Sequence, residues 1–493
     1  MTTTPLWRDT EHTYPTADFP ADQRFDVAVV GAGFTGLTTA LFLAAEGRSV
    51  VVLESRDLGA GASGATTAKA SVLQGVRVST IRKRHGLDTA RSYATANRYG
   101  LDWWADFCAT HGVATQRPRA VTYARGVRGV GAIWAELRTL EELGYPARWC
   151  ETLDVPFPAR AAVELPDQLQ LDPMAALVAL AGAVAEAGGR LVEATRVTGL
   201  RVRGTGEATR VEVRTHAGTL TAADVVLCTA SPALDRGITA ATMEAERSYL
   251  CAFDFDGDLA EGMYASVESP VRSLRTATVD GRQVLLVGGN GHRTGTAAPI
   301  ASKLDSLREF AAEYFPGARP THGWSAQDFH PVTLLPRAGR LPWGRGHVHF
   351  AGGYSKWGLT GAPAAARIVA DGLLGRSSKL SFGRPTVSGT ARSAVPMFAD
   401  LPAQLTAAAV EAAVRRPRPR LLPTGRATGP DGRPCEVSLV CPHMGAALAW
   451  NPVEESWDCP WHGSRFSPCG ELLEGPATSD LTRRDGDSRR SGR

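Results

Sequence analysis

The stretch that decides the fold runs from Phe25 to Glu54 and reads FDVAVVGAGFTGLTTALFLAAEGRSVVVLE. Val27–Val30 predicts a short buried strand, the apolar segment after the glycine-rich turn predicts a helix, and Val50–Leu53 predicts a second strand. The turn itself, Gly31-Ala-Gly-Phe-Thr-Gly36, has the glycine spacing of a dinucleotide-binding βαβ unit. Such a turn lets a pyrophosphate approach the backbone at the positive end of the helix. Glu54 stands where an acid would hold ribose hydroxyls, which argues against an ordinary βα turn.

The composition bounds the class of protein. A length of 493 residues allows several domains, and 43% hydrophobic with 21% charged residues is ordinary for a globular protein. The net charge of +4 is small and no basic stripe is interleaved with aromatic residues, which argues against a nucleic-acid partner. We find neither a signal-peptide pattern nor an apolar run long enough for a transmembrane segment, so we expect a cytoplasmic protein. Four scattered cysteines predict buried small side chains: Cys108, Cys150, Cys228 and Cys251.

A second stretch is typical of a cofactor wall. Leu58–Ser71, LGAGASGATTAKAS, consists almost entirely of small residues, which would let the backbone run beside an extended cofactor. Its hydroxyl side chains and Lys69 could bind that cofactor, and a flexible loop is the alternative. Gly129-Val-Gly131 lacks a third glycine and a strong preceding strand. We therefore expect no second dinucleotide site and no separate NAD(P)H domain.

The middle of the chain predicts a second, substrate-binding domain. Ser248–Phe255, Tyr264–Val267 and Thr276–Val287 read as strands, and Asp280-Gly281 predicts a two-residue hairpin turn within the last of them. One apolar face at Leu304–Tyr314 predicts a helix. An antiparallel sheet with helices, inserted between parts of a nucleotide-binding fold, is the expected form of a substrate domain.

Near residue 350 the chain predicts a further strand and helix. His347–Gly353 reads as a strand, and GYSKWGLTGAPAAA leads into a helix expected from about Ala362, with Pro363 in its first turn. The glycine-rich turn could present a second anion site, and an ordinary βα unit is the alternative. Lys356 in this turn is a weak catalytic candidate, for activating oxygen or stabilising reduced flavin. Other pocket candidates, each with a structural role as alternative, are His292, Trp324, Asp328 and Tyr354.

These motifs resemble those of the D-amino-acid-oxidase-like (DAO) family of FAD-dependent oxidoreductases, over roughly Phe25 to Gly375. The resemblance includes Asp172-Pro173, and the variants TTAK and KWGLT indicate a subgroup with a C-terminal iron–sulfur domain. It implies oxidation of a C–N bond of an amine or amino acid, or sometimes a C–O bond, by hydride transfer to FAD. The FAD contacts of the family carry over to Gly31, Gly33, Gly36, Glu54, Ser63, Thr66, Thr67, Val197, Gly358, Leu359, Thr360 and Gly361.

The C-terminal part carries four metal-ligating residues in two tight pairs. Cys441-Pro-His443 and Cys459-Pro-Trp-His462 are separated by fifteen residues, and Gly463-Ser464 follows. In a Rieske domain such pairs place two thiolates on one iron and two imidazoles on the other, which predicts a [2Fe–2S] cluster. Zinc is the main rival, but zinc fingers group these ligands as CxxC and HxxxH. The spacing therefore favours a Rieske domain, with Cys441, His443, Cys459 and His462 as ligands.

Departures from the high-potential type of Rieske domain bear on the expected redox potential. Ala446 and Trp461 stand where that type carries a disulfide between the ligand loops, and Phe466 stands where it carries a tyrosine that bonds a ligand sulfur. Fewer hydrogen bonds to sulfur lower the potential, so we expect a value in the lower part of the range of about −150 to +300 mV. Cys435 and Cys469 lie elsewhere, and we expect them to be unpaired.

The expected fold class is an α/β FAD-binding fold of the Rossmann-like, glutathione-reductase type, with an inserted α+β substrate domain and a small all-β Rieske domain. A polar surface lead-in is expected at 1–24, and a linker arm at 376–420 with one helix, Pro402–Val414. The expected FAD-binding parts are 25–75, 165–235 and 325–375, the substrate parts 76–164 and 236–324, the Rieske domain 421–481, and a disordered tail 482–493.

FAD and a one-electron cluster on one chain predict a two-to-one electron converter. The chain would oxidise a small substrate and pass single electrons to the cluster, then to a one-electron acceptor protein or a quinone. One alternative is an oxidase that hands electrons to O2 and keeps a structural or redox-sensing cluster. Another is a non-catalytic flavin and iron–sulfur electron carrier.

Overall fold

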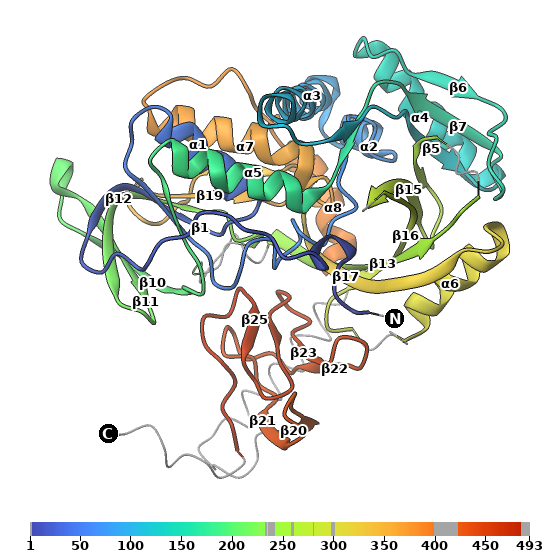
Figure 1. The fold of residues 1–493 in the computed structure, drawn as a ribbon. Coiled ribbons are helices and arrows are strands. Elements are labelled where there is room, and N and C mark those ends of the chain that lie inside the picture. The colour runs from blue at the N-terminus through green and yellow to red at the C-terminus, as the bar shows by residue number, and fades with distance from the viewer. Residues whose placement is uncertain are drawn as a thin grey trace.

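The computed structural model of the chain describes residues 2–231, 234, 242–257, 261–279, 281–296, 301–398 and 423–484. They form two eight-stranded sheets with helices and a small C-terminal β domain (Figure 1). This is the predicted combination of an α/β part, an α+β part and an all-β domain.

The first sheet is built around three parallel strands, two of which the sequence predicts. β1 (Arg24–Val30) pairs in parallel with β2 (Val50–Leu53) on one side and with β12 (Thr219–Leu227) on the other. Their apolar residues are buried, as expected of parallel strands covered on both faces. The remaining strands of this sheet are β9 (Arg190–Val192), β10 (Val197–Arg203), β11 (Arg210–Thr215), β18 (Arg337–Arg340) and β19 (Val348–Gly352).

Helices α1 (Phe34–Ala44), α5 (Pro173–Glu186) and α7 (Gly358–Leu373) lie side by side above this sheet (Figure 1). Asp172 and Pro173 define the start of α5. The carboxylate of Asp172 accepts hydrogen bonds from the backbone N–H groups of Met174 at 2.8 Å and Ala175 at 3.1 Å. Pro173 occupies the first helical position, where its missing N–H costs nothing.

The start of α7 differs from the prediction. The helix begins at Gly358, before the expected start near Ala362, so Pro363 lies inside it rather than in its first turn. A proline at this position leaves the carbonyl of Leu359 without its helical partner. The indole Nε1 of Trp104 donates to that carbonyl instead, at 2.6 Å. A contact from a distant helix thus makes the earlier start possible.

Trp104 belongs to α3 (Leu87–His111), which covers α7 and follows α2 (Arg77–His85). The two helices α3 and α7 approach closely because residue 100 is a glycine. A Cβ at Gly100 would lie 1.9 Å from the carbonyl oxygen of Thr360. The close approach fixes the N-terminal turn of α7, which borders the cavity described below.

The second sheet has the strand order β17-β13-β16-β15-β14-β5-β7-β6. Its hairpin joins β15 (Arg272–Val279) and β16 (Arg282–Arg293) with Val279 opposite Arg282, as the sequence predicts. Gly129 and Gly131 lie in α4 (Val127–Glu142), which packs on this part and forms no phosphate turn. The other elements here are β5 (Ala120–Ala124), β6 (Arg148–Cys150), β7 (Ala161–Leu165), β13 (Met243–Asp254), β14 (Met263–Ser266), β17 (Arg319–Pro331) and α6 (Ala301–Tyr314).

Three short strands, β3 (Lys69–Ala70), β4 (Thr115–Gln116) and β8 (Leu169–Leu171), form a separate small sheet. The lead-in departs from the predicted surface position, because Trp7 in the short helix η1 (Leu6–Arg8) is buried and donates to the carbonyl of Thr66 at 2.9 Å.

The predicted linker arm contains a helix that the sequence did not reveal. α8 (Val387–Phe398) begins after Thr386, whose hydroxyl accepts from the N–H of Gly389 at 3.1 Å. Thr386 is the residue in the sequence that could have predicted the start of this helix, because threonine is a favoured helix N-cap. The helix predicted at Pro402–Val414 lies outside the described residues.

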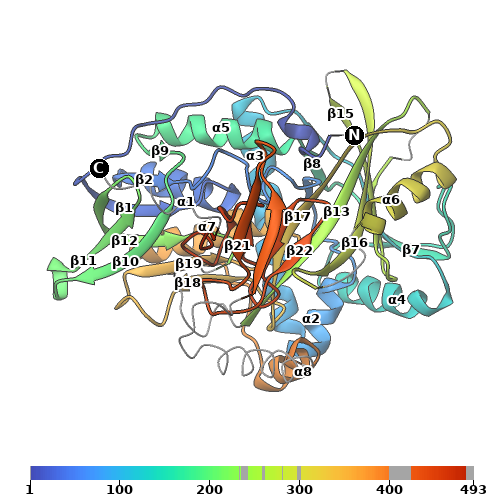
Figure 2. The same cartoon turned by 90° about the horizontal axis from the view of Figure 1, so that it is seen from below.

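The C-terminal domain has one two-stranded and one four-stranded antiparallel sheet. Figures 1 and 2 show it against the edge of the molecule where β13 and β17 run. Among the described residues, no helix is long and apolar enough to cross a membrane. The strands are β20 (Thr424–Thr428), β21 (Pro434–Ser438), β22 (Ala449–Asn451), β23 (Ser456–Asp458), β24 (Arg465–Phe466) and β25 (Leu472–Glu474).

Candidate functional site

A cavity of about 810 Å³ lies between the two large sheets and the C-terminal domain. Its volume falls within the range of about 300–1,000 Å³ typical of ligand sites. Three predicted FAD contacts, Gly36, Thr360 and Gly361, do not line it. The predicted contacts that do line it are Gly31, Gly33, Glu54, Ser63, Thr66, Thr67, Val197, Gly358 and Leu359.

The glycine turn is packed so closely that none of its three glycines could carry a side chain. Gly31 has φ +103°, and a Cβ there would lie 2.8 Å from the carbonyl oxygen of Cys228. A Cβ at Gly33 would lie 2.8 Å from Oγ of Ser63, and one at Gly36 would lie 1.8 Å from the carbonyl oxygen of Gly31. The turn is therefore packed so that its backbone faces the cavity at the N-terminus of α1. This arrangement fits a pyrophosphate.

Glu54 closes the end of β2 beside this turn. Its carboxylate accepts from the backbone N–H of Ala32 at 2.9 Å and from that of Arg56 at 3.0 Å. Oγ of Ser63 lies 3.2 Å from the N–H of Phe34 in the first turn of α1. These bonds hold the acid and the hydroxyl at the cavity wall. Together with the cavity volume and the glycine turn, they fit a bound dinucleotide such as FAD.

Thr360 and Gly361 lie behind the wall that they were predicted to form. The hydroxyl of Thr360 donates to Oδ1 of Asn97 at 2.7 Å. A Cβ at Gly361 would lie 2.5 Å from the ring of Tyr354, whose hydroxyl is 3.0 Å from that of Thr35 in α1. Both residues thus position the turn before α7, and Tyr354 lines the cavity.

A group of charged side chains forms the wall near this turn. Lys356 lines the cavity, its Nζ pairs with Glu246 from β13, and its backbone N–H donates to the carboxylate of Asp328. Burial raises the pKa of Asp328 to about 6. Burial also opposes ionisation of Glu246, but the charges of Lys356 and His330 outweigh it and lower the pKa of Glu246. No sequence signal marks Glu246, because strand pairing alone brings it here.

Lys69 also lines the cavity, where it contacts strands β14 and β15. Its Nζ donates to Oγ of Ser273 at 2.6 Å and to the carbonyl of Tyr264 at 3.1 Å. Burial lowers the pKa of Lys69 to about 7. Of the remaining pocket candidates, His292 and Trp324 do not line the cavity, whereas Asp328 and Tyr354 do.

The two predicted ligand loops contact each other in the C-terminal domain. The thiols of Cys441 and Cys459 interact closely, which lowers the pKa of Cys441 to about 7 and raises that of Cys459. The rings of His443 and His462 have their centroids 5.0 Å apart. Sulfurs are thus paired with sulfurs and imidazoles with imidazoles, as a two-iron cluster requires.

The surroundings of the ligands also fit a cluster. Nδ1 of His462 is buried without a hydrogen-bond partner, and burial lowers the pKa of that ring to about 4, so it is in the neutral form that ligates. Ser464 bonds the sulfur of Cys441, whereas Phe466 is fully buried and has no hydroxyl.

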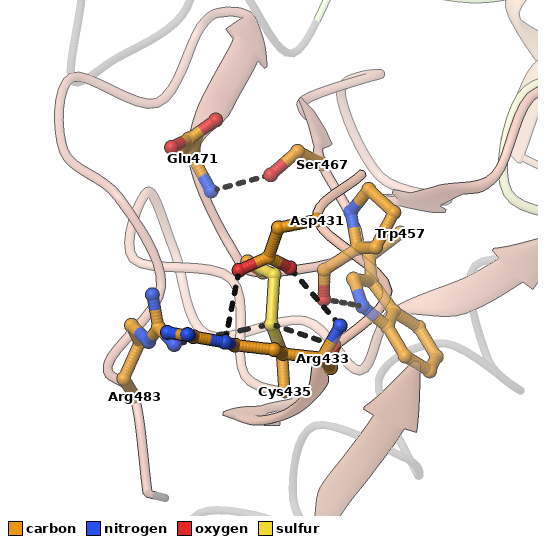
Figure 3. Close-up of a disulfide and its surroundings, with 9 residues drawn as sticks. Asp431, Arg433, Cys435, Trp457, Ser467, Glu471 and Arg483 are labelled. Atoms are coloured by element: carbon orange, nitrogen blue, oxygen red, sulfur yellow. Dashed lines mark hydrogen bonds and ion pairs between the residues drawn. A yellow bond between two sulfur atoms is a disulfide. The ribbon is translucent and has the colours of Figure 1, made fainter. Parts of the chain in front are cut away.

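The expectation for Cys435 and Cys469 is wrong, because they form a disulfide (Figure 3). Cys435 lies in β21 and Cys469 in the turn between β24 and β25, with a Cα–Cα distance of 5.2 Å. Nε1 of Trp457 in β23 donates to the carbonyl of Pro468 at 3.2 Å, which holds that turn against β23. Tertiary packing brings together two cysteines that the ligand-loop pattern of Rieske domains does not pair.

The comparisons with known proteins agree with both sites. A family described as FAD dependent oxidoreductase (DAO) matches residues 26–372, and the Rieske [2Fe-2S] domain matches residues 402–484. A protein named as Rieske 2Fe-2S iron-sulfur protein YhfW, from Bacillus subtilis, is 28% identical over 489 residues, 95% of each chain.

Two further comparisons concern the larger part of the chain. Gamma-glutamylputrescine oxidoreductase of Escherichia coli is 26% identical over 377 residues, which covers 72% of this chain and 84% of that protein. The structure of glycine oxidase from Geobacillus kaustophilus has a TM-score of 0.61 at 20% identity, and covers 73% of this chain and 97% of that one. The predicted fold class is confirmed, and the chain belongs to the DAO family of FAD-dependent oxidoreductases and carries a C-terminal Rieske [2Fe–2S] domain.

Proposed function

We propose that this FAD-dependent oxidoreductase oxidises a C–N bond of a small amine or amino acid and passes the electrons singly through its Rieske domain to an external acceptor. In the substrate a C–H bond and an N–H bond are broken and the C–N bond becomes a C=N bond, which releases two electrons and two protons. When bound, FAD takes up a pair of electrons and a Rieske cluster carries one at a time. The acceptor would be a one-electron protein or a quinone.

The observation that carries this proposal is the position of the cluster loops beside the FAD cavity. Nε2 of Gln327 donates a hydrogen bond at 2.8 Å to the carbonyl of Gly463, the residue after the proposed ligand His462. Gln327 lines the cavity, as does its neighbour Asp328. The residues that would hold FAD and those that would hold the cluster are therefore linked through one buried side chain. Such closeness supports direct electron exchange between the two cofactors.

The type of substrate is inferred from the cavity and from the names of the relatives. The cavity extends beyond the glycine turn to the second sheet, where Ser273, Gly288 and Asn290 line it and leave room for a small molecule. The names of gamma-glutamylputrescine oxidoreductase and glycine oxidase point to an amine and an amino acid.

Different residues in the cavity would bind FAD and transfer protons. We assign the binding of FAD to the glycine turn, Glu54 and the start of α7. Lys69 and Asp328 are cavity groups whose pKa values of about 7 and about 6 let them hold or release a proton near neutral pH.

Rapid mixing of the anaerobic protein with amines and amino acids tests the proposal. A substrate should bleach the flavin absorbance, and freeze-quenched samples should then show the EPR signal of a reduced Rieske cluster. Cys459→Ser, which removes a proposed ligand, should retain flavin bleaching and lose the EPR signal. If the flavin bleaches, the cluster stays oxidised and added O2 is consumed, the chain is an oxidase and the proposal is wrong.

A further inference from the structure

The C-terminal domain contributes directly to the cavity assigned to FAD. Leu473, Glu474, Gly475, Ala477 and Thr478 line the same space as Gly31 and Glu54. The N–H of Ala477 donates to the hydroxyl of Ser464 at 3.0 Å, so this segment is also tied to the cluster loop. One short stretch thus borders both cofactor sites.

A buried ionic network fixes this domain on β13. Arg247 from β13 is 2% exposed, and its guanidinium lies 2.6 Å from the carboxylate of Glu454 and 3.9 Å from that of Glu474. Arg465, which is 7% exposed and belongs to the C-terminal domain, pairs with the same two acids and with Asp458 at 3.1 Å. Removing one member of such a buried network leaves unpaired charge in a dry site. Arg247 is the member that crosses between the domains.

Closely packed backbone adds to this contact. Oγ of Ser325 in β17 accepts from Nε of Arg247 at 2.9 Å and donates to Glu454. A Cβ at Gly463 would lie 2.4 Å from Cβ of Ala245, so the cluster loop touches β13 itself. Arg196, which precedes β10, donates to the carbonyl of Leu472 at 2.8 Å. The C-terminal domain therefore contacts β13, β17 and the residue before β10.

We propose that the Rieske domain is a structural part of the FAD site, in which the segment Leu473–Thr478 forms one wall and Arg247 is the residue that positions it. FAD that touches this wall binds more tightly when the domain is docked, and by linkage bound FAD strengthens the docking. The inference goes beyond the proposed function, since it holds for any substrate and for either direction of electron flow.

The rate of FAD loss from the holoprotein tests the positioning role of Arg247. Flavin fluorescence, which rises as FAD leaves after dilution, should increase at least tenfold faster in Arg247→Met than in the wild type. Arg247→Lys keeps the charge and should restore the rate to within about threefold of the wild type. Arg426→Met is the matched control, because Arg426 is 81% exposed and pairs with Glu436 at 2.9 Å inside the same domain. Its rate should be unchanged.

The Rieske EPR signal of Arg247→Met should keep the wild-type g-values, which shows that the domain itself is folded. Wild-type rates of FAD loss in a folded Arg247→Met would overturn the positioning role of Arg247. Equal acceleration in Arg426→Met would overturn it too, because general destabilisation would then be the cause.

Hydrogen exchange of the unmodified chain tests the wall without any variant, and decides the matter if Arg247→Met does not fold. Adding FAD to the flavin-free protein should slow exchange in peptides that cover Leu472–Thr478 as well as in those that cover Gly31–Gly36. Peptides from β20 and β21, which do not line the cavity, should not change. Protection at the glycine turn without protection at Leu472–Thr478 would overturn the inference, whatever the substrate tests show.

Discussion

Phe466 offers no hydroxyl to the cluster sulfurs, at a position where a high-potential Rieske domain has a tyrosine. Its ring is fully buried beside the ligand loops. In Phe466→Tyr a new hydrogen bond to a ligand sulfur would stabilise the reduced cluster. We expect the midpoint potential to rise by on the order of 60 mV, which is a factor of ten for a one-electron couple. An EPR-monitored redox titration measures it.

Phe466→Leu is the control, since it changes the packing without adding a hydroxyl. If it raises the potential as much as Phe466→Tyr does, the hydrogen-bond explanation fails. A wild-type potential near the top of the Rieske range would also refute the prediction of a low value.

Glu136 should make stability depend on pH. This fully buried acid on α4 accepts from the backbone N–H of Ser79 at 2.8 Å and of Val78 at 3.2 Å at the start of α2. Burial raises its pKa from 4.5 to about 7. The folded chain therefore holds the proton more tightly than the unfolded chain, and the stability from that proton is present below pH 4.5 and lost as pH rises towards 7.

Glu136→Gln removes this loss because its amide does not ionise. The difference in thermal midpoint between Glu136→Gln and the wild type should grow in favour of the variant from pH 5 to pH 8. In free energy of unfolding this growth should amount to a few kcal/mol, at about 1.4 kcal/mol per pKa unit. Glu142 lies on the same helix as Glu136 and forms an exposed ion pair with Arg82 of α2, so Glu142→Gln should show no such trend. A constant difference between Glu136→Gln and the wild type at both pH values would contradict the prediction.

At the scale of elements, the contact between α3 and α7 sets the start of α7. Gly100→Ala would place a methyl group 1.9 Å from the carbonyl oxygen of Thr360, so the two helices must separate. We expect a loss of about 1–3 kcal/mol in unfolding free energy, as for an overpacked core, and weaker FAD binding. Differential scanning calorimetry and flavin titration measure the two effects.

Gly131→Ala is the matched control for Gly100→Ala. Gly131 also lies within a helix, α4, but apart from its chain neighbours and the backbone of its own helix no atom lies within 4 Å of the place its Cβ would take. Alanine there should stabilise the helix by about 0.5–1 kcal/mol and leave FAD binding unchanged. Similar effects of the two substitutions would mean that the α3–α7 contact is not the reason.

At the scale of the whole molecule, the disulfide bears on the compartment in which the chain matures. Disulfides rarely persist in the cytoplasm, so the Cys435–Cys469 bond argues against the predicted cytoplasmic location. After rapid alkylation of cell extracts, mass spectrometry should find both residues unalkylated. Cys435→Ala should lower the stability of the Rieske domain by about 2–4 kcal/mol and leave the cluster EPR signal intact. Alkylated cysteines in the folded holoprotein would show that the bond does not form there.

The sequence by itself determined the two cofactor motifs and the class of fold. Gly31–Gly36 and the two Cys–His pairs are local patterns, since each needs only a few neighbouring residues to define its geometry. The strands β1 and β2 and the hairpin β15–β16 could be predicted for the same reason, because buried apolar runs and two-residue turns are encoded within short windows.

Only the tertiary structure decided which distant residues meet. Glu246 reaches Lys356 through strand pairing, Trp104 satisfies a carbonyl in α7, and Cys435 joins Cys469 through the packing of two sheets. The docking of Arg247 against Glu454 belongs to the same class. Such contacts depend on how separate elements pack against one another. The free energy of burial that drives this packing is shared among many residues, so no single stretch of the sequence shows which distant residues will meet.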